Sequence, residues 1–243
     1  MPTSAIATLF VGFVLGLQHA TETDHVVAVT TLASDTGSAR RAALTGALWG
    51  LGHMVTLFLM GSMLIVLRVK MGPQTEWSLE FVVALVLIWL GVHTIRNCFA
   101  GRFHIHSHEH AGRAHAHLHF HEKGEAGHVH DAHAGKPQCR GLNHGPTSVL
   151  VGMAHGLAGT GALALVVLTS IPSRTLGVIY LLVFGFGALV GMAAFSALLG
   201  LPIAGAAKRL SWLNAMRFAA GAGSSALGAI LAYRAFLPGM FPF

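Results

Sequence analysis

Six long hydrophobic segments run along the chain, and each is long enough to cross a bilayer as a helix. A membrane-spanning helix needs about 20 predominantly apolar residues. The apolar residues follow one another without the two-residue alternation of a membrane β-barrel, which favours helices. The pattern predicts an all-α integral membrane protein with about six transmembrane helices, over residues 5–32, 42–67, 79–100, 147–171, 175–200 and 212–236.

The composition agrees with a membrane protein. Charged residues make up only 10% of the 243 residues, and hydrophobic residues make up 53%. Soluble domains carry about 25% charged residues. The formal net charge of +6 reflects Lys and Arg in the loops of one membrane face, so we expect no nucleic-acid partner. The two cysteines, Cys98 and Cys139, form no metal or redox motif.

Four ionisable residues interrupt the first segment, namely His19, Glu22, Asp24 and His25. A carboxylate near the bilayer centre costs about 2.5–3.5 kcal/mol on insertion scales, so such residues mark functional sites. Imidazole and carboxylate together suit Ni(II), Co(II), Zn(II) or Cu(II) better than Mg(II) or Ca(II). We interpret the cluster as a site for a divalent metal ion, with a hydrogen-bonded polar kink as the alternative.

The spacing within this cluster predicts an interrupted helix. At about 100° per residue, a regular helix places His19, Glu22 and His25 within an arc of roughly 120°. Asp24 points about 100° away from His25 on the same helix. Asp24 can therefore join the other three only if the helix unwinds, and the first segment is long for one span. We predict a break near Glu22–Asp24.

Two histidines in other segments are further candidate ligands. His53 follows Gly52 in the apolar second segment, and His155 in the fourth segment occupies the position that corresponds to His19. A histidine that only packs in the core is the alternative for both, and it is the interpretation we favour for His93. The predicted metal ligands are therefore His19, Glu22, Asp24, His25, His53 and His155.

The two halves of the chain share short motifs in the same order. The motifs pair Gly16–His19 with Gly152–His155, Gly50–His53 with Gly185–Ala188, and Leu90–Gly91 with Leu227–Gly228. A three-helix unit that recurs after an odd number of crossings is inverted in the membrane, as in many secondary transporters. We predict two inverted three-helix repeats, over 1–100 and 147–243. The second repeat lacks the acids, since Thr160 and Gly161 stand in place of Asp24 and His25.

The segment between the repeats, 101–146, is rich in His, Gly, Ala and charge and has no apolar period, so we expect a mobile loop. Most of its histidines alternate with other residues: His104, His106, His108, His110, His115, His117, His119, His121, His128, His130 and His133. Such a tract predicts a labile chelator that weakens as the imidazoles are protonated. A low-complexity linker is the alternative.

Charge predicts the orientation in the membrane. One face of the six-helix arrangement carries Arg40, Arg41, Arg96, Arg102, Arg113, Lys123, Lys136, Arg140, Lys208, Arg209 and Arg217, and the other carries Arg68, Lys70, Arg174 and Arg234. Because cytoplasmic loops carry the excess of Lys and Arg, we expect the His-rich loop in the cytoplasm. Both termini then lie outside the inner (plasma) membrane.

The polar cluster resembles a family signature. The residues His19-Ala20-Thr21-Glu22-Thr23-Asp24-His25-Val26 are similar to the motif His-Ala-x-Asp-Ala-Asp-His-Ile of the nickel/cobalt transporter (NiCoT) superfamily, and Gly52-His53-Met54-Val55-Thr56 is similar to a second motif. The larger members begin with a span that this chain lacks, and their second-half acidic motifs are absent. The chain is more similar to the short urease-accessory (UreH-like) branch. The resemblance implies Ni²⁺ or Co²⁺ as the substrate.

These observations predict a permease that moves Ni²⁺, or Co²⁺, across the bacterial inner membrane, with uptake favoured. The sequence contains no Gly-x-x-x-x-Gly-Lys-Ser/Thr or His-Glu-x-x-His motif, so we expect no ATPase, no zinc hydrolase and no bound cofactor. The expected partners are the metal ion, the lipid bilayer and a cytoplasmic nickel chaperone. Efflux and a non-transporting membrane metal sensor or chaperone stay open as alternatives.

Overall fold

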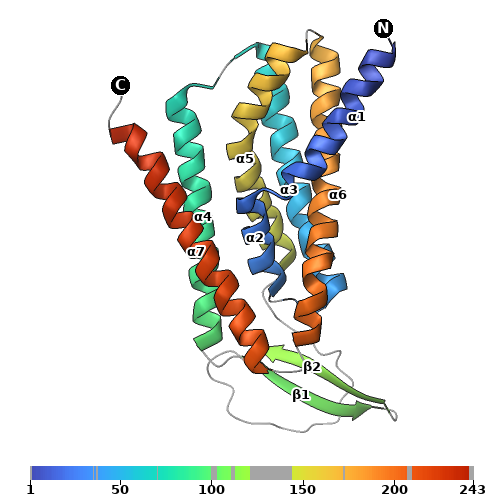
Figure 1. Cartoon of the computed structure of the whole chain (residues 1–243), viewed down its shortest axis with the longest axis vertical. Coiled ribbons are helices and arrows are strands. Elements are labelled where there is room, and N and C mark those ends of the chain that lie inside the picture. Colours follow the sequence, from blue (N-terminus) through green and yellow to red (C-terminus); the bar gives the residue numbers. More distant parts are fainter. Residues whose placement is uncertain are drawn as a thin grey trace.

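The computed structural model of the chain is mainly helical (Figure 1). The described backbone covers residues 2–34, 36, 38–69, 71–99, 103–110, 113–120, 144–171, 173–206 and 210–240. Side chains are described over 5–34, 36, 38–69, 71–99, 145–158, 171, 173–205 and 211–236. In this part of the chain the elements are seven helices and one two-stranded hairpin.

The helices coincide with the predicted hydrophobic segments. They are α1 (Pro2–His19), α2 (Thr23–Ser34), α3 (Ala39–Leu67), α4 (Pro73–Phe99), α5 (His144–Ser170), α6 (Arg174–Ala206) and α7 (Leu210–Met240). Among the described residues, α3, α4, α6 and α7 are long and apolar enough to cross a membrane, and α1 with α2 makes a fifth candidate span. The chain is therefore a multi-pass helical membrane protein. Helix α1 begins and α7 ends at one end of the bundle, opposite the hairpin (Figure 1).

A bend separates helices α1 and α2. The first helix ends at His19, the second begins at Thr23, and their axes differ by 57°. Backbone N–H groups of Thr21 and Glu22 donate to carbonyls three residues earlier, at 2.9 and 3.1 Å. Such tight bonds are common where an α-helix ends. The predicted break near Glu22–Asp24 is confirmed, although it begins just before Glu22.

Packing places the short helix α2 inside the bundle. Helix α3 packs against α5 and α6, α1 packs along α6, and α4 packs along α7. Helix α2 contacts α3, α4, α6 and α7. It therefore joins the α4–α7 pair to the other helices, and its first turn lies in the interior.

Glycines allow α1 and α6 to approach closely. A Cβ atom added at Gly16 would collide with the backbone of Phe184 and Ala188. A Cβ added at Gly187 would collide with the carbonyl oxygen of Phe13. These two glycines thus face each other's helix at backbone distance, as small residues do in membrane helix pairs.

Helices α3 and α5 meet in the same way. A Cβ added at Gly152 would collide with the carbonyl oxygen of Trp49 and lie 3.1 Å from the backbone nitrogen of His53. A Cβ added at Gly52 would collide with the carbonyl oxygen of Val149. The close approach brings the backbone around His53 against α5.

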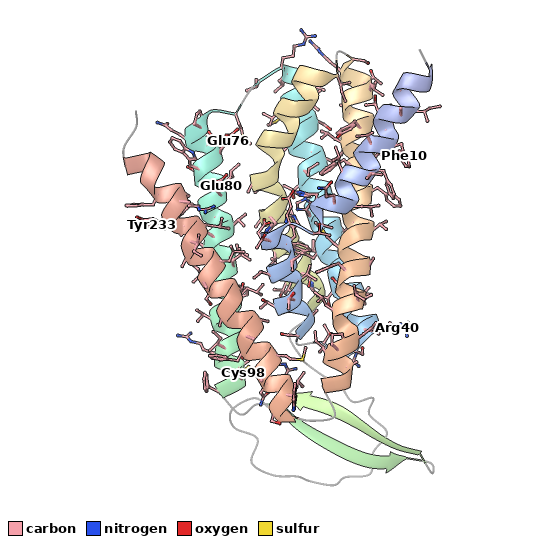
Figure 2. The ribbon with its side chains drawn as sticks, viewed as in Figure 1. Phe10, Arg40, Glu76, Glu80, Cys98 and Tyr233 are labelled. Carbon is pink, nitrogen blue, oxygen red and sulfur yellow. The ribbon has the colours of Figure 1, made fainter. Side chains whose placement is uncertain are left out.

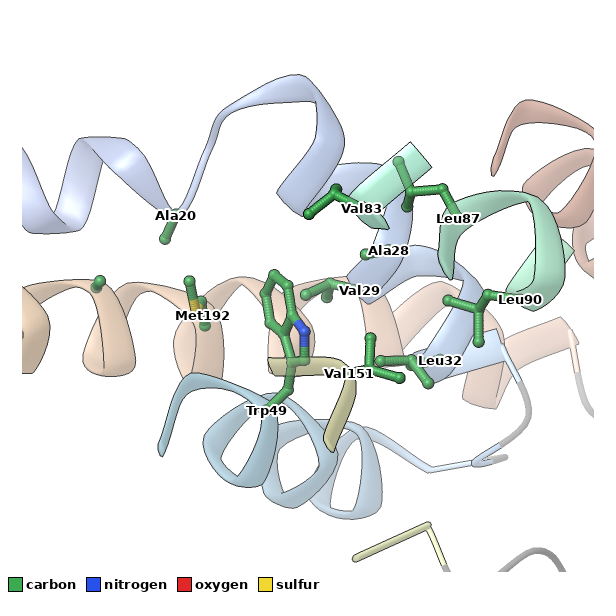
Figure 3. Close-up of a cluster of buried hydrophobic side chains, with 11 residues drawn as sticks. Ala20, Ala28, Val29, Leu32, Trp49, Val83, Leu87, Leu90, Val151 and Met192 are labelled. Carbon is green, nitrogen blue, oxygen red and sulfur yellow. The ribbon is translucent and has the colours of Figure 1, made fainter. Parts of the chain in front are cut away.

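The main apolar core surrounds α2 (Figure 3). Ala28, Val29 and Leu32 of α2 are buried in one cluster with Trp49 of α3 and Leu87 of α4. Because lipid is as apolar as these side chains, close packing rather than removal from water stabilises the contacts. These contacts hold α2 against α3 and α4, and they begin one turn after its polar N-terminal residues.

The outer surface of the bundle is apolar. Phe10 on α1 and Tyr233 on α7 project outwards and are 66% and 64% exposed (Figure 2). Leu59 on α3 and Trp89 on α4 are 61% and 51% exposed. An apolar exterior of this extent suits contact with lipid. Arg40, by contrast, lies near the hairpin end of the bundle (Figure 2).

The first part of the His-rich segment forms a hairpin of β1 (Phe103–His110) and β2 (Arg113–Phe120). Its antiparallel register pairs His104 with His119, His106 with His117 and His108 with His115. The sequence predicts a mobile loop over 101–146, whereas 103–110 and 113–120 form paired strands. The two-residue alternation of histidine, interpreted above only as a chelating tract, suits extended strands. Residues 121–143 lie outside the described residues.

Arg217 of α7 is completely buried. Its Nε donates to the carbonyl oxygen of Ser34, the last residue of α2, at 3.0 Å. A positive charge at a helix C-terminus is favourable because the carbonyl ends carry partial negative charge. Arg217, counted above with the basic residues of one membrane face, instead connects α7 to the end of α2.

Candidate metal site

Five of the predicted ligands converge in the interior. His19 ends α1, Asp24 and His25 occupy the first turn of α2, and His53 and His155 lie within α3 and α5. Potential ligand atoms form two groups, His19–His25–His53 and Asp24–His25–His155, each with atoms within 4.8 Å of one another. Five residues from four helices are therefore gathered around a common centre.

His25 is that centre. The centroid of its ring lies 4.4 Å from the ring of His19, 5.1 Å from that of His53 and 4.8 Å from that of His155. It is only 2% exposed. The bend after His19 is what allows this arrangement, because it lets α2 enter the bundle with His25 facing inward.

Several imidazole nitrogens at the site have no hydrogen-bond partner within the described part of the chain. They are Nε2 of His19, both ring nitrogens of His25 and His53, and Nδ1 of His155. A buried polar atom left unsatisfied costs about 1–3 kcal/mol, and native structures rarely retain such atoms without a reason. Each neutral imidazole has one nitrogen lone pair, so the four rings together can offer nitrogen ligands to a metal ion.

Asp24 connects α2 to α5. His155 Nε2 donates to Asp24 Oδ2 at 2.9 Å. The other carboxylate oxygen lies 3.2 Å from His25 Nδ1, a charged contact without hydrogen-bond geometry. With its side chain 29% exposed, Asp24 supplies the negative charge of the site.

Glu22 occupies a different position from the one a regular helix predicts. Its side chain is 57% exposed, and its Oε1 accepts a hydrogen bond from His19 Nδ1 at 2.9 Å. It belongs to neither group of potential ligands. The bond fixes the ring of His19 with Nε2 directed inward, as carboxylates do for metal-bound histidines.

Two aromatic side chains that sequence reasoning missed enclose the site. The ring of Trp49 lies 5.2 Å from His25 and 5.5 Å from His155. The ring of Phe184 lies 5.3 Å from His19. The repeat contained a signal for both, because Trp49 precedes Gly50 in one half and Phe184 precedes Gly185 in the other.

Other candidates lie elsewhere or outside the described side chains. His93 on α4 stacks on Trp89, with ring centroids 5.5 Å apart, and belongs to neither ligand group. The side chain of Thr160 is not among those described. Ala188 stands on α6 where His53 stands on α3. The ligands described are therefore concentrated in the first half of the chain.

The donor set suits a transition-metal dication. Metal–nitrogen bonds of about 2.0–2.1 Å place neighbouring ligand atoms about 3–4 Å apart, so small side-chain rotations would close either group around an ion. Neutral imidazoles with one carboxylate favour intermediate metals over Mg²⁺ and Ca²⁺. The arrangement can bind such an ion inside the membrane.

The chain is related to a characterised protein over most of its length. It is 32% identical over 210 residues to the urease accessory protein UreH of Bacillus sp. (strain TB-90), and the match covers 86% of this chain and 83% of that protein. No family model and no solved structure matches the chain. The chain therefore belongs to the UreH family, the short urease-accessory branch of the nickel/cobalt transporter superfamily.

Proposed function

We propose that this protein is a permease that moves Ni²⁺, or Co²⁺, across the inner membrane through the buried His/carboxylate site. The observation that carries the proposal is the convergence of four histidines and Asp24 within a bundle of membrane-spanning helices. Ionisable residues are costly inside a membrane, and they line ion pathways when they occur there. The related protein is named for an accessory role to urease, which agrees with nickel as the cargo.

We further propose that the two halves are inverted repeats that alternate access to the site by moving against each other. Support comes from close helix contacts in one half that have counterparts in the other half. The contacts of Gly16 with Phe184 and Ala188 correspond, under the motif pairing, to those of Gly152 with Trp49 and His53.

Helices α4 and α7 also make contacts that correspond between the two halves. A Cβ at Gly91 would contact Gly221 and Ser225, and a Cβ at its counterpart Gly228 would contact Ala84 and Ile88. Under the motif pairing, Gly221 corresponds to Ala84 and Ser225 corresponds to Ile88. A packing pattern of this kind is what two related three-helix units produce.

The proposed direction is uptake, with the His-rich segment in the cytoplasm and both termini outside. The excess of Lys and Arg at the hairpin end supports this orientation. The role proposed for the His-rich segment is to chelate the arriving ion and present it to a cytoplasmic nickel chaperone. Efflux is the reverse use of the same pathway.

The test is metal transport by purified protein in proteoliposomes. Radioactive Ni²⁺ is supplied outside or inside, with Co²⁺ and Zn²⁺ as competitors, and wild type is compared with His25→Ala. We expect wild type to move Ni²⁺ and His25→Ala to lose at least about 100-fold in rate, because the variant lacks the central ligand. The matched control is His93→Ala, which removes a membrane histidine outside both groups and should transport normally.

The result also separates the permease from its rival. A wild-type protein that binds Ni²⁺ but moves none in either direction, under any ion gradient, would be a membrane metal sensor or chaperone. Transport by His25→Ala at the wild-type rate would show that the ion does not pass through this site. Faster transport of Zn²⁺ than of Ni²⁺ or Co²⁺ would change the assigned cargo.

A further inference from the structure

The two ligand groups overlap in one residue only. His25 belongs to both, whereas His19 and His53 complete one group and Asp24 and His155 complete the other. No larger group within the described residues brings its ligand atoms within the same 4.8 Å. The five side chains therefore define two adjacent triads instead of a single shell.

One histidine in each triad belongs to a pair that the motif pairing relates. His19 and His155 occupy corresponding positions in the two halves, and so do their aromatic neighbours Phe184 and Trp49. The ring of His19 lies 5.3 Å from Phe184, and the ring of His155 lies 5.5 Å from Trp49. Each triad thus contains one histidine of this pair, while Trp49 also lies 5.2 Å from His25 and 6.3 Å from His53.

The triads also differ in position and charge. Helix α1 enters from the end with the termini, and α2 continues towards the hairpin end (Figure 1). His19 therefore precedes the bend, and Asp24 follows it. The triad of His19 contains imidazoles only, and the triad of His155 includes a carboxylate.

We propose that the site holds the metal ion in two successive positions and that His25 passes the ion from one to the other. In the first position the ligands are His19, His25 and His53. In the second they are His25, Asp24 and His155. The inference rests on the proposed transport function, since a transfer between positions has a use only if the ion crosses.

Physical chemistry favours such a transfer. Keeping His25 bound while the other two ligands are exchanged avoids releasing a bare dication into a low-dielectric interior, which would be very costly. In the second position the ion lies beside the carboxylate of Asp24. The carboxylate charge then partly neutralises the ion.

Binding of Ni²⁺ to the purified, full-length protein in detergent tests the proposal. Titration calorimetry gives Kd, and X-ray absorption at the nickel edge gives the ligands. The variants are His53→Ala and His155→Ala, each of which removes one triad, and His25→Ala, which removes a ligand from both. Asparagine substitutions at the same positions provide second variants if an alanine variant does not fold, and His93→Ala is the control.

We expect His53→Ala and His155→Ala each to bind one Ni²⁺ with Kd raised less than about 10-fold, and His25→Ala to raise Kd at least about 100-fold. The spectrum of His53→Ala should contain a carboxylate oxygen, and that of His155→Ala should show weaker carboxylate scattering. Both should lose transport, because each retains only one position.

A single composite site would give another result. All three variants would then weaken binding alike, and the spectra of His53→Ala and His155→Ala would each lose one imidazole from the same set. That outcome overturns the two-position proposal and leaves nickel transport intact. Absence of transport by wild type in proteoliposomes would instead refute the permease while the binding measurements still stood.

Discussion

Asp24 of α2 and His155 of α5 are joined by a 2.9 Å hydrogen bond, although 131 residues separate them in the chain. The bond links the two halves of the protein at the metal site. Asp24→Asn keeps the shape of the side chain and removes its charge. We expect Ni²⁺ transport to fall by about 10–100-fold, because the charge that balances the dication is lost.

Transport in proteoliposomes measures this effect, and Asp24→Glu serves as the comparison because it retains the charge. Partial activity of Asp24→Glu with none in Asp24→Asn would identify the charge as the requirement. Full activity of Asp24→Asn would show that hydrogen bonding to His155 is sufficient.

Glu22 should influence the site through His19. Glu22→Gln exchanges a carboxylate acceptor for an amide and weakens the control of the His19 ring orientation. We expect Ni²⁺ affinity to fall by about 10-fold, the lower end of the range for residues that orient metal ligands. Calorimetry on Glu22→Gln and His19→Ala provides the measurement. A loss from Glu22→Gln as large as that from His19→Ala would make Glu22 a direct ligand.

Gly152 should be intolerant of any side chain. Gly152→Ala places a methyl group against the backbone of Trp49, so α3 and α5 must separate. We expect the free energy of unfolding to fall by about 1–3 kcal/mol, as in other overpacked interiors. Gly223→Ala on α7 is the matched control, because a Cβ there meets no atom within 4 Å. Thermal unfolding in detergent compares the two, and equal stability would contradict the close contact.

Arg217 should stabilise the fold through α2. Arg217→Met removes the donor to the Ser34 carbonyl, and leaving that buried acceptor unpaired costs about 1–3 kcal/mol. Arg234→Met, on the exposed surface of the same helix, should cost far less. Thermal unfolding of both variants tests the difference. A similar small loss in both would mean that the bond to Ser34 contributes nothing.

The proposed orientation predicts sided labelling. In a protein with Cys98 and Cys139 replaced, Gly72→Cys introduces an exposed thiol between α3 and α4, and Arg40→Cys introduces one at the start of α3. A membrane-impermeant maleimide should label Gly72→Cys in intact cells and Arg40→Cys only after the membrane is opened. The reverse pattern would place the His-rich segment outside.

Sequence predicted the helices well because each is a continuous apolar segment. It also predicted the break in the first span, since no regular helix can direct His19, Asp24 and His25 to one place. What it could not give is the rotation of α2 relative to α1 after the bend. That rotation directs Asp24 inward and leaves Glu22 exposed, the opposite of the regular-helix expectation.

Partners from distant helices were also only partly predictable. The motif pairing identified His155, but nothing in the sequence indicated its bond to Asp24, which depends on how closely α5 approaches α2. Trp49 and Phe184 resembled ordinary core residues because aromatic side chains are common in apolar helices. Only the repeat, combined with the packing of α1 on α6 and of α5 on α3, gives them corresponding places beside the site.

For the proposed alternating-access carrier, the absence of acids from the second half has a kinetic consequence. Two related halves can form two end states of similar shape, yet Thr160 and Gly161 replace Asp24 and His25, so the ion meets unlike surroundings in each state. The driving gradient alone fixes the final ratio of ion across the membrane. Unequal binding in the two proposed states would instead set different half-saturating concentrations on the two faces.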